Sequence, residues 1–300
     1  MIEKPMMLLV NPAAGRSASE YDLGAVIRAF CEAGYAPTVY FTDAPGAAIE
    51  MTARLAPNYR RLVCLGGDGT LSDTICGLMR LPHVLRPMLG YIPMGTANDV
   101  ANTLGLPMRQ PVRAVEKLLN GSPLAYDVGE MVDVGYFSYI AAFGVFTEVS
   151  YKTDQELKRT LGHLAYVIEG INSLSSVKSY KATVEYTGGS LEGEFIYGAV
   201  TNALSVGGLM KLDKELVDLS DGKFELLLVQ KPQTAVDLSS AVSALMNQDY
   251  ASSRALTVVQ SDHIRFRFQT DVPWTRDGED GGSHRELEFR CHPRAIQIYR

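Results

Sequence analysis

The sequence predicts an α/β domain followed by a mostly antiparallel β domain. Its 300 residues are enough for two domains. As far as about residue 126, short apolar runs alternate with amphipathic stretches, which is typical of a parallel sheet with helices on its faces. Beyond Asp127, apolar residues recur at every second position, as in half-buried antiparallel strands. We therefore expect domains over residues 1–126 and 127–292, with residues 293–300 available to complete the first.

Each element of the first domain has a simple sequence signature. Leu23, Val26, Ile27 and Phe30 have helical spacing, and Gly34 follows them at the expected end of a helix. By the same reasoning, the expected strands are 6–10, 38–41, 61–65 and 88–92, and the expected helices are 21–33, 47–55, 71–79 and 111–119.

The second domain is expected to consist mainly of paired strands. Arg265 and Arg267 alternate with apolar side chains in the clearest of them, and Gly188-Gly189 indicates a hairpin turn. The expected strands are 182–186, 195–200, 224–229 and 263–269, and the expected helices are 154–174 and 234–246.

Composition excludes several classes of protein. A net charge of −6 argues against nucleic-acid binding through a broad basic surface. The four cysteines form no C-x-x-C pair and the five histidines no H-x-x-x-H pair, so a zinc enzyme is not expected. The first apolar run ends too early, at Asn11-Pro12, for a signal peptide, and no stretch approaches the ~20 apolar residues of a spanning helix. We expect a cytoplasmic protein whose membrane contact is peripheral.

The segment Gly66-Gly67-Asp68-Gly69-Thr70 lies between an expected strand and an expected helix. Glycines at such a junction allow positive φ and let backbone N–H groups approach an anion, which the helix N-terminus also favours. An acidic side chain beside phosphates makes sense with a divalent cation between them, so Asp68 indicates Mg²⁺ as well. A glycine-rich turn without a ligand is the alternative.

Two further segments end strands in a similar way. Residues 10–16 follow the first strand and residues 92–99 follow the fourth, at the carboxyl ends where open α/β sheets bind ligands. Neither has the G-x-x-x-x-G-K-[ST] spacing of a P-loop, and Asn98-Asp99 alone is equally typical of a helix cap. Three such loops at one sheet edge indicate a phosphate-binding site.

The motifs NPAAG at 11–15, GGDGT at 66–70 and PMGTAND at 93–99, in this order and spacing, resemble the diacylglycerol kinase catalytic-domain family. That family includes bacterial diacylglycerol and other lipid kinases and the sphingosine and ceramide kinases. The resemblance covers essentially the whole chain. It implies an N-terminal domain similar to NAD kinases and phosphofructokinases, a C-terminal antiparallel β-sandwich, and an active site in the cleft between them.

The resemblance also implies roles for individual residues. Asp68 would organise a catalytic Mg²⁺ at the phosphates of ATP, and Asp99 and Asp127 would belong to the same polar network. Arg16, Asn98 and Lys158 would complete that network, although Lys158 is equally typical of a solvated basic helix face. The residues expected to contact the nucleotide are Asn11, Pro12, Ala13, Ala14, Gly15, Thr42, Gly66, Gly67, Asp68, Gly69, Thr70, Leu71, Ser72 and Thr96.

In the second domain, the turn around Asp221-Gly222 matches one that holds a structural Mg²⁺ in relatives. The resemblance implies the Asp221 carboxylate and the backbone carbonyls of Asp218 and Lys223 as ligands. Few protein oxygens and several waters suit this ion. A hairpin turn without metal is the alternative.

Glu279 matches the acid of the family's Asp-Gly-Glu motif, which the resemblance assigns as general base. A lipid hydroxyl is a weak acid, so a carboxylate that accepts its proton assists attack on the γ-phosphorus. Taken without the resemblance, the acidic segment 275–282 is simply a turn. Asp277 and Asp280 are close enough in sequence to share the role of Glu279.

Two departures from the family pattern concern the substrates. Relatives commonly have Lys where this chain has Arg16, which changes the geometry of a phosphate contact from a point charge to a fork. The segment 205–213 has two glycines instead of three and lacks the usual Pro and Ala, so the identity of the lipid stays open.

We expect an ATP- and Mg²⁺-dependent kinase that phosphorylates a lipid hydroxyl by direct in-line transfer at the inner membrane face, with diacylglycerol as the first substrate to consider. Phosphatidylglycerol, monoacylglycerol or a sphingoid base are alternative acceptors, as is a soluble metabolite such as NAD or a polyol. A nucleotide-binding regulator without chemistry is the non-enzyme alternative. The GTAND motif argues against an NAD kinase, and retention of Asp68 and Glu279 argues against a regulator. Exposed sandwich edges would allow a homodimer.

Overall fold

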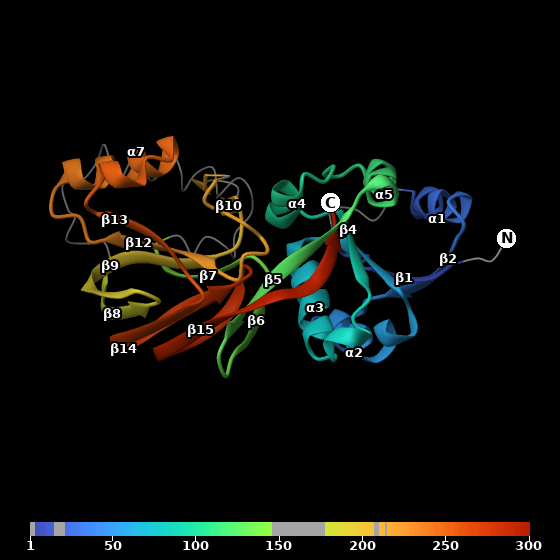
Figure 1. Cartoon of the computed structure of the whole chain (residues 1–300), viewed down its shortest axis with the longest axis horizontal. Coiled ribbons are helices and arrows are strands. Elements are labelled where there is room, and N and C mark those ends of the chain that lie inside the picture. Colours follow the sequence, from blue (N-terminus) through green and yellow to red (C-terminus); the bar gives the residue numbers. More distant parts are fainter. Residues whose placement is uncertain (1–3, 15–21, 146–177, 207–209, 214) are drawn as a thin grey trace.

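A computed structural model describes residues 4–14, 22–145, 178–206, 210–213 and 215–300. It contains two domains that lie side by side along the long axis of the molecule (Figure 1). The expected helix at 154–174 lies outside the described residues. None of the helices in the described part is both long enough and apolar enough to cross a membrane.

The first domain is a parallel sheet with helices on both faces. Strands β2, β1, β3 and β4 pair in this order, all in parallel. Helices α1 and α5 pack together on one face of the sheet, and α2 and α3 pack together on the other (Figure 1). The elements are β1 (Lys4–Val10), α1 (Leu23–Glu32), β2 (Tyr35–Phe41), α2 (Ala47–Leu55), β3 (Arg61–Gly66), α3 (Asp68–Met79), β4 (Met88–Pro93), α4 (Asp99–Leu104) and α5 (Pro111–Asn120).

The sequence explains why this sheet is central. Residues 6–10 of β1 and 62–65 of β3 are at most 1% exposed. Such continuous apolar runs are typical of strands that are covered on both faces. Burial of this surface is the main contribution to the stability of the domain, at roughly 25 cal/mol per Å² of apolar area.

The second domain is antiparallel, as predicted. Its core is a cluster of aromatic side chains in which Trp274 packs against Phe143, Phe266 and Phe289, with ring centroids 4.8–5.2 Å from that of Trp274. The elements are β5 (Pro123–Met131), β6 (Gly135–Phe137), β7 (Ile140–Gly144), β8 (Tyr180–Tyr186), β9 (Gly189–Thr201), β10 (Ser205–Val206), β11 (Met210–Lys211), β12 (Phe224–Gln230), α7 (Ala235–Asn247), β13 (Leu256–Ser261), β14 (His263–Arg276) and β15 (Glu279–Tyr299).

Strand β15 connects the two domains. It pairs antiparallel with β14 and β5, and near its end Ile298 pairs in parallel with Leu89 of β4. The single sheet order β7-β14-β15-β4-β3 therefore runs from one domain into the other. The C-terminal residues add a strand to the first sheet, and the start of β15 lies at the domain junction.

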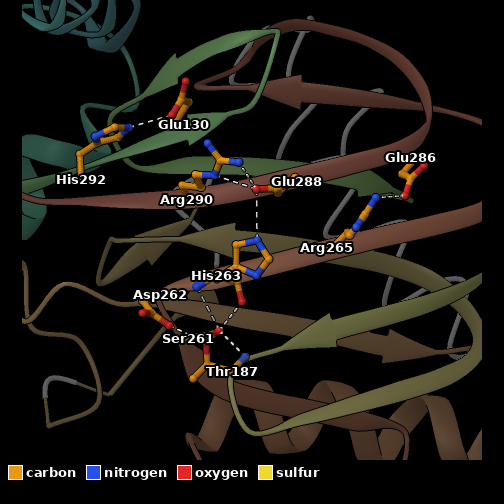
Figure 2. Close-up of polar contacts among 10 residues, drawn as sticks. All are labelled: Glu130, Thr187, Ser261, Asp262, His263, Arg265, Glu286, Glu288, Arg290 and His292. Carbon is orange, nitrogen blue, oxygen red and sulfur yellow. Dashed lines mark hydrogen bonds and ion pairs between the residues drawn. The ribbon is translucent and has the colours of Figure 1, made fainter.

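The outward face of β14 and β15 carries charged pairs (Figure 2). Ile264, Phe266 and Phe268 of β14 are buried, which confirms the predicted alternation. The intervening side chains form ion pairs with β15, and β15 forms a further one with β5. Because these side chains are partly exposed, solvent screens the pairs and they stabilise the sheet only weakly. The pairs in Figure 2 are Arg265–Glu286, His263–Glu288, Arg290–Glu288 and His292–Glu130.

Candidate functional site

The three predicted loops meet at one edge of the parallel sheet. The backbone N–H of Asn11 donates to Leu65 O at 2.9 Å, and that of Met94 donates to Gly66 O at 2.7 Å. The Asn11 side chain also donates from Nδ2 to Thr70 Oγ1 at 2.8 Å. The ends of β1, β3 and β4 are thereby held together at the N-terminus of α3.

The glycine-rich segment is not the loop that the sequence suggested. Gly66 is the last residue of β3, Gly67 is the N-cap, and Asp68 already begins α3. None of the three glycines at 66, 67 and 69 has a positive φ, so that part of the prediction is wrong. The need for glycine is steric at position 66, where a Cβ would lie 2.6 Å from the Thr70 side chain.

The segment after β4 packs directly on this helix start. A Cβ on Gly95 would lie 2.7 Å from the Cα of Gly67 and 3.6 Å from the backbone N of Asp68. The N-cap of α3 has no side-chain hydrogen bond. The first N–H groups of a helix have no partner within the helix, so this N-terminus suits an anion.

Asn98 shapes the segment after β4 and does not cap α4 with its side chain. It has a left-handed φ of 52°. Its Oδ1 accepts from Gly95 N at 2.9 Å and its Nδ2 donates to Gly95 O at 2.7 Å. Tyr91 OH also donates to Asn98 Oδ1 at 3.3 Å. Thr96, the expected nucleotide contact next to it, is exposed.

Asp68 has one carboxylate oxygen in use and one without a partner. Its Oδ2 accepts from the backbone N–H of Asp99 at 3.2 Å, which places these two acids together as expected. Its Oδ1 is buried and has no hydrogen-bond partner among the described residues. Burial and, next, the charge of Asp99 raise the pKa of Asp68 to about 7. This carboxylate is therefore arranged to receive a proton or a cation.

Glu279 comes to the same place from the second domain. It directly follows the turn between β14 and β15, in which Asp277 and Gly278 both have positive φ. Its side chain is exposed, and its Oε1 lies 3.6 Å from the position that a Cβ on Gly69 would occupy. Asp68, the first residue of α3, and Glu279, from the second domain, thus both lie at the start of this helix.

The other two acids of this turn have structural partners. The Asp277 carboxylate is buried and accepts hydrogen bonds from Ser72, Ser138, Tyr139 and Ile140. Asp280 accepts from Gly282 N at 2.8 Å within its own strand. The structural role of Asp277 was not apparent from the sequence, in which Asp-Gly signals only a turn.

The carboxylate of Asp127 has partners of its own, and its place in the Asp68 network stays a prediction. Its buried carboxylate accepts from Gly222 N and from Arg294 N, both at 2.6 Å. Arg294 belongs to β15, so the acceptors of Asp127 are taken by backbone groups that only the folded second domain brings near. Asp127 therefore supports the Asp221-Gly222 turn.

The acidic side chains of the expected metal turn have local hydrogen-bond partners. Asp218 and Asp221 are exposed, and each accepts a local backbone hydrogen bond, from Ser220 N at 3.0 Å and Lys223 N at 2.9 Å. Among the described residues, no three His, Cys, Asp or Glu side chains group closely enough to hold a metal.

Glu225 lies close to this turn and was not predicted as a site residue. It is 1% exposed, and its Oε2 has no partner among the described residues. Burial raises the pKa of Glu225 to about 8, and the charges of Asp221 and Asp218 act in the same direction. No local signal marks it, because its position in β12 has the pattern of an ordinary strand residue.

The remaining expected residues divide into two groups. Thr42 lies at the end of β2, where its N–H donates to Val10 O at 2.9 Å, beside the Asn11 segment. Gly15, Arg16 and Lys158 lie outside the described residues, as does part of the segment 205–213.

Known proteins resemble this chain over most of its length. The diacylglycerol kinase catalytic domain model matches residues 5–131, and the YegS C-terminal NAD kinase beta sandwich-like domain model matches residues 140–300. A diacylglycerol kinase of Bacillus subtilis (strain 168) is 32% identical over 280 residues, which cover 93% of this chain and 91% of that protein. A diacylglycerol kinase of Staphylococcus carnosus (strain TM300) is 31% identical over 94% of this chain and 90% of its own.

A solved structure agrees with the two-domain fold. The crystal structure of a diacylglycerol kinase from Bacillus anthracis str. Sterne superimposes with a TM-score of 0.72 at 20% identity, and the match covers 99% of this chain and 97% of that chain. At this identity the likeness concerns the fold alone. The family models and the sequence relatives establish membership: the chain belongs to the diacylglycerol kinase family.

Proposed function

We propose that this protein is an ATP-dependent lipid kinase that transfers the γ-phosphoryl group to a lipid hydroxyl, with diacylglycerol as acceptor and phosphatidic acid as product. The observation that carries the proposal is that Asp68 is the first residue of α3 and that Glu279 Oε1 lies 3.6 Å from the position a Cβ on Gly69, the next residue, would occupy. An acid for the phosphate side and an acid for the acceptor side thus face one anion-binding helix end. Family membership supports the same reaction class.

In this mechanism the first turn of α3 binds the phosphates of ATP through backbone N–H groups. The segments 11–15 and 93–99 and Thr42 enclose the nucleotide at the strand ends. Glu279 accepts the proton of the lipid hydroxyl as it attacks, which its exposed carboxylate beside Gly69 allows. The family resemblance assigns Arg16 and Lys158 to the same site, where their positive charges would offset negative charge on the phosphoryl group during transfer.

Mg²⁺ fits the residues present at the phosphate side. The buried Oδ1 of Asp68 has no hydrogen-bond partner among the described residues, and a carboxylate oxygen is a ligand that Mg²⁺ prefers. Asp68 would hold the ion, which when bound offsets negative charge on the phosphates. For the second-domain turn, the Asp221 carboxylate and the backbone carbonyls of Asp218 and Lys223 would hold a structural Mg²⁺, with waters as its other ligands.

We also propose the domain division at residues 126/127, peripheral action at the inner membrane face, and a homodimer formed through sandwich edges. The edge position of β13 in the sheet order supports the last of these. Light scattering of the purified protein tests the oligomer, and co-sedimentation with anionic vesicles tests the membrane contact.

The proposed reaction is tested with radiolabelled ATP and a panel of lipids in mixed micelles. Asp68→Asn and Glu279→Gln are expected to lower lipid phosphorylation by ~10²–10⁴-fold, the range of a lost acid–base group. Asp280→Asn is the matched control, because the Asp280 carboxylate accepts a hydrogen bond from Gly282 in its own strand. Its rate of lipid phosphorylation should stay within about twofold of wild type. Transfer to NAD or a polyol but to no lipid would refute the lipid proposal. Wild-type turnover in Glu279→Gln would refute the role of that residue.

A further inference from the structure

The carboxylate of Asp277 is buried at the domain junction and accepts hydrogen bonds from both domains. Five donor groups lie within hydrogen-bond distance of it, and the residue is 4% exposed. Oδ2 accepts from Ser72 Oγ at 2.6 Å, from Ser138 N at 2.6 Å and from Ser138 Oγ at 2.8 Å. Oδ1 accepts from Tyr139 N at 3.0 Å and Ile140 N at 3.1 Å. A buried carboxylate without such donors would strongly destabilise the fold, so this arrangement is strongly specified.

Ser72 is the donor that comes from the first domain. It follows Asp68 by one helical turn of α3 and is 8% exposed. The backbone donors at 138–140 instead come from the connection between β6 and β7 in the second domain. The bond from Ser72 to Asp277 therefore ties the helix that begins the phosphate site to the hairpin that carries Glu279.

Only the turn residue Gly278 separates Asp277 from Glu279, so fixing Asp277 also restricts Glu279. Asp277 and Gly278 have φ of 48° and 84°, and Arg276 pairs directly with Glu279 across the turn. A two-residue turn of this kind has little freedom once its first residue is fixed. Arg276 is fixed as well, because its Nη1 donates to Tyr136 O at 3.0 Å. The backbone of Glu279 is thereby set relative to Gly69.

We propose that Ser72 and Asp277 form an interdomain clasp that positions Glu279 over the first turn of α3. In this account the Ser72 hydroxyl serves Asp277 and is not a nucleotide contact. Neither residue touches the substrates, so both are positioning residues. The inference rests on the proposed function, because it assigns the clasp to the base of that reaction.

A double-mutant cycle between Ser72 and Glu279 tests the clasp. Lipid phosphorylation is followed with radiolabelled ATP for wild type, Ser72→Ala, Glu279→Gln and the double variant, with KM for ATP and lipid measured separately. We expect Ser72→Ala to lower kcat about tenfold, since small misplacements of a reacting group are costly. We expect KM for ATP to stay within about twofold, and the double variant to be no slower than Glu279→Gln alone.

Two further variants separate positioning from general damage. Ser72→Thr keeps a hydroxyl and should recover most of the lost kcat. Thr74→Val removes another buried hydroxyl of the same helix, one that donates to Thr70 O at 2.7 Å, and should leave kcat within about twofold. Thermal unfolding of every variant shows that the compared proteins are folded.

The outcomes distinguish the clasp from the proposed reaction. An equal loss from Ser72→Ala in the wild-type and Glu279→Gln backgrounds, or a loss expressed mainly in KM for ATP, would overturn the clasp and leave the kinase proposal intact. Full turnover in Glu279→Gln alone would instead remove the base role, and with it the purpose assigned to the clasp.

Discussion

Replacing Gly95 by alanine tests whether the segment after β4 must lie directly on the start of α3. A Cβ at this position would lie 2.7 Å from Gly67 Cα and 2.8 Å from Asn98 Oδ1, whereas ordinary contacts begin at 3.4 Å. The two backbones must therefore separate by about 0.7 Å, the difference 3.4 − 2.7. The φ of Gly95 is not left-handed, so alanine meets a steric obstacle and no backbone strain.

Overpacking of this size costs about 1–3 kcal/mol, and the reduced freedom of alanine in the unfolded chain returns about 0.4–1 kcal/mol. We expect a net destabilisation of about 1–2 kcal/mol, measured by urea unfolding at equilibrium. Because the same methyl group approaches the N–H of Asp68, ATP affinity should also fall by about tenfold in a titration followed by thermal shift.

Gly67→Ala is the matched comparison for stability, since it enters the same contact from the other side. Its Cβ would lie 3.3 Å from Gly95 Cα, which needs a much smaller adjustment. Gly67→Ala should therefore be the more stable of the two variants. The reasoning is refuted if Gly95→Ala unfolds at the wild-type urea concentration and binds ATP as tightly as wild type.

Three further predictions concern acids with unusual surroundings. Burial raises the pKa of Glu225 to about 8, so between its unfolded pKa near 4.5 and pH 8 the native state holds a proton that the unfolded state lacks. Stability should then fall as pH rises through this window, by at most ~1.4 kcal/mol per unit, and urea unfolding in EDTA should show a flatter profile for Glu225→Gln. Asp127→Asn places an amide against two backbone N–H donors, and should cost about 1–3 kcal/mol in urea unfolding while KM for ATP is unchanged. The raised pKa of Asp68, about 7, predicts that MgATP affinity falls as pH drops from 8 to 6, because a proton competes with the cation for this carboxylate. Calorimetric titrations of Asp68→Asn should show no such trend.

Local periodicity was a good guide to the elements. The helix expected at 47–55 matches α2, and the strands expected at 61–65 and 88–92 are each one residue longer in the structure. The agreement is close because apolar runs and amphipathic spacing mark these elements in the sequence. The start of α3 was missed for the same reason. Asp68, Gly69 and Thr70 carry no apolar periodicity, so the pattern predicted a helix only from residue 71.

Contacts between distant segments were beyond the reach of this reasoning. Asp127 follows the first domain in sequence, and the family resemblance placed it in the polar network of Asp68. Its two acceptor oxygens are instead used by the backbone of Gly222 and Arg294. Arg294 reaches Asp127 only because β15 returns along β5, a pairing that depends on long-range register. No pattern near Asp127 carries that information.

The geometry of the hairpin supports the proposal that Glu279, and neither of its acidic neighbours, is the base. Side chains alternate across a strand, so adjacent residues after a turn point to opposite faces. With Asp277 and Gly278 forming the turn, Glu279 pairs with Arg276 and Asp280 pairs with Thr275. The turn sends Asp277 inward to its five donor contacts and leaves Glu279 beside Gly69. If the turn took in Glu279 as a third residue, Asp280 would pair with Arg276 and lie where Glu279 now lies. The length of the turn, and not the acidic composition of the segment, therefore selects the residue that faces α3.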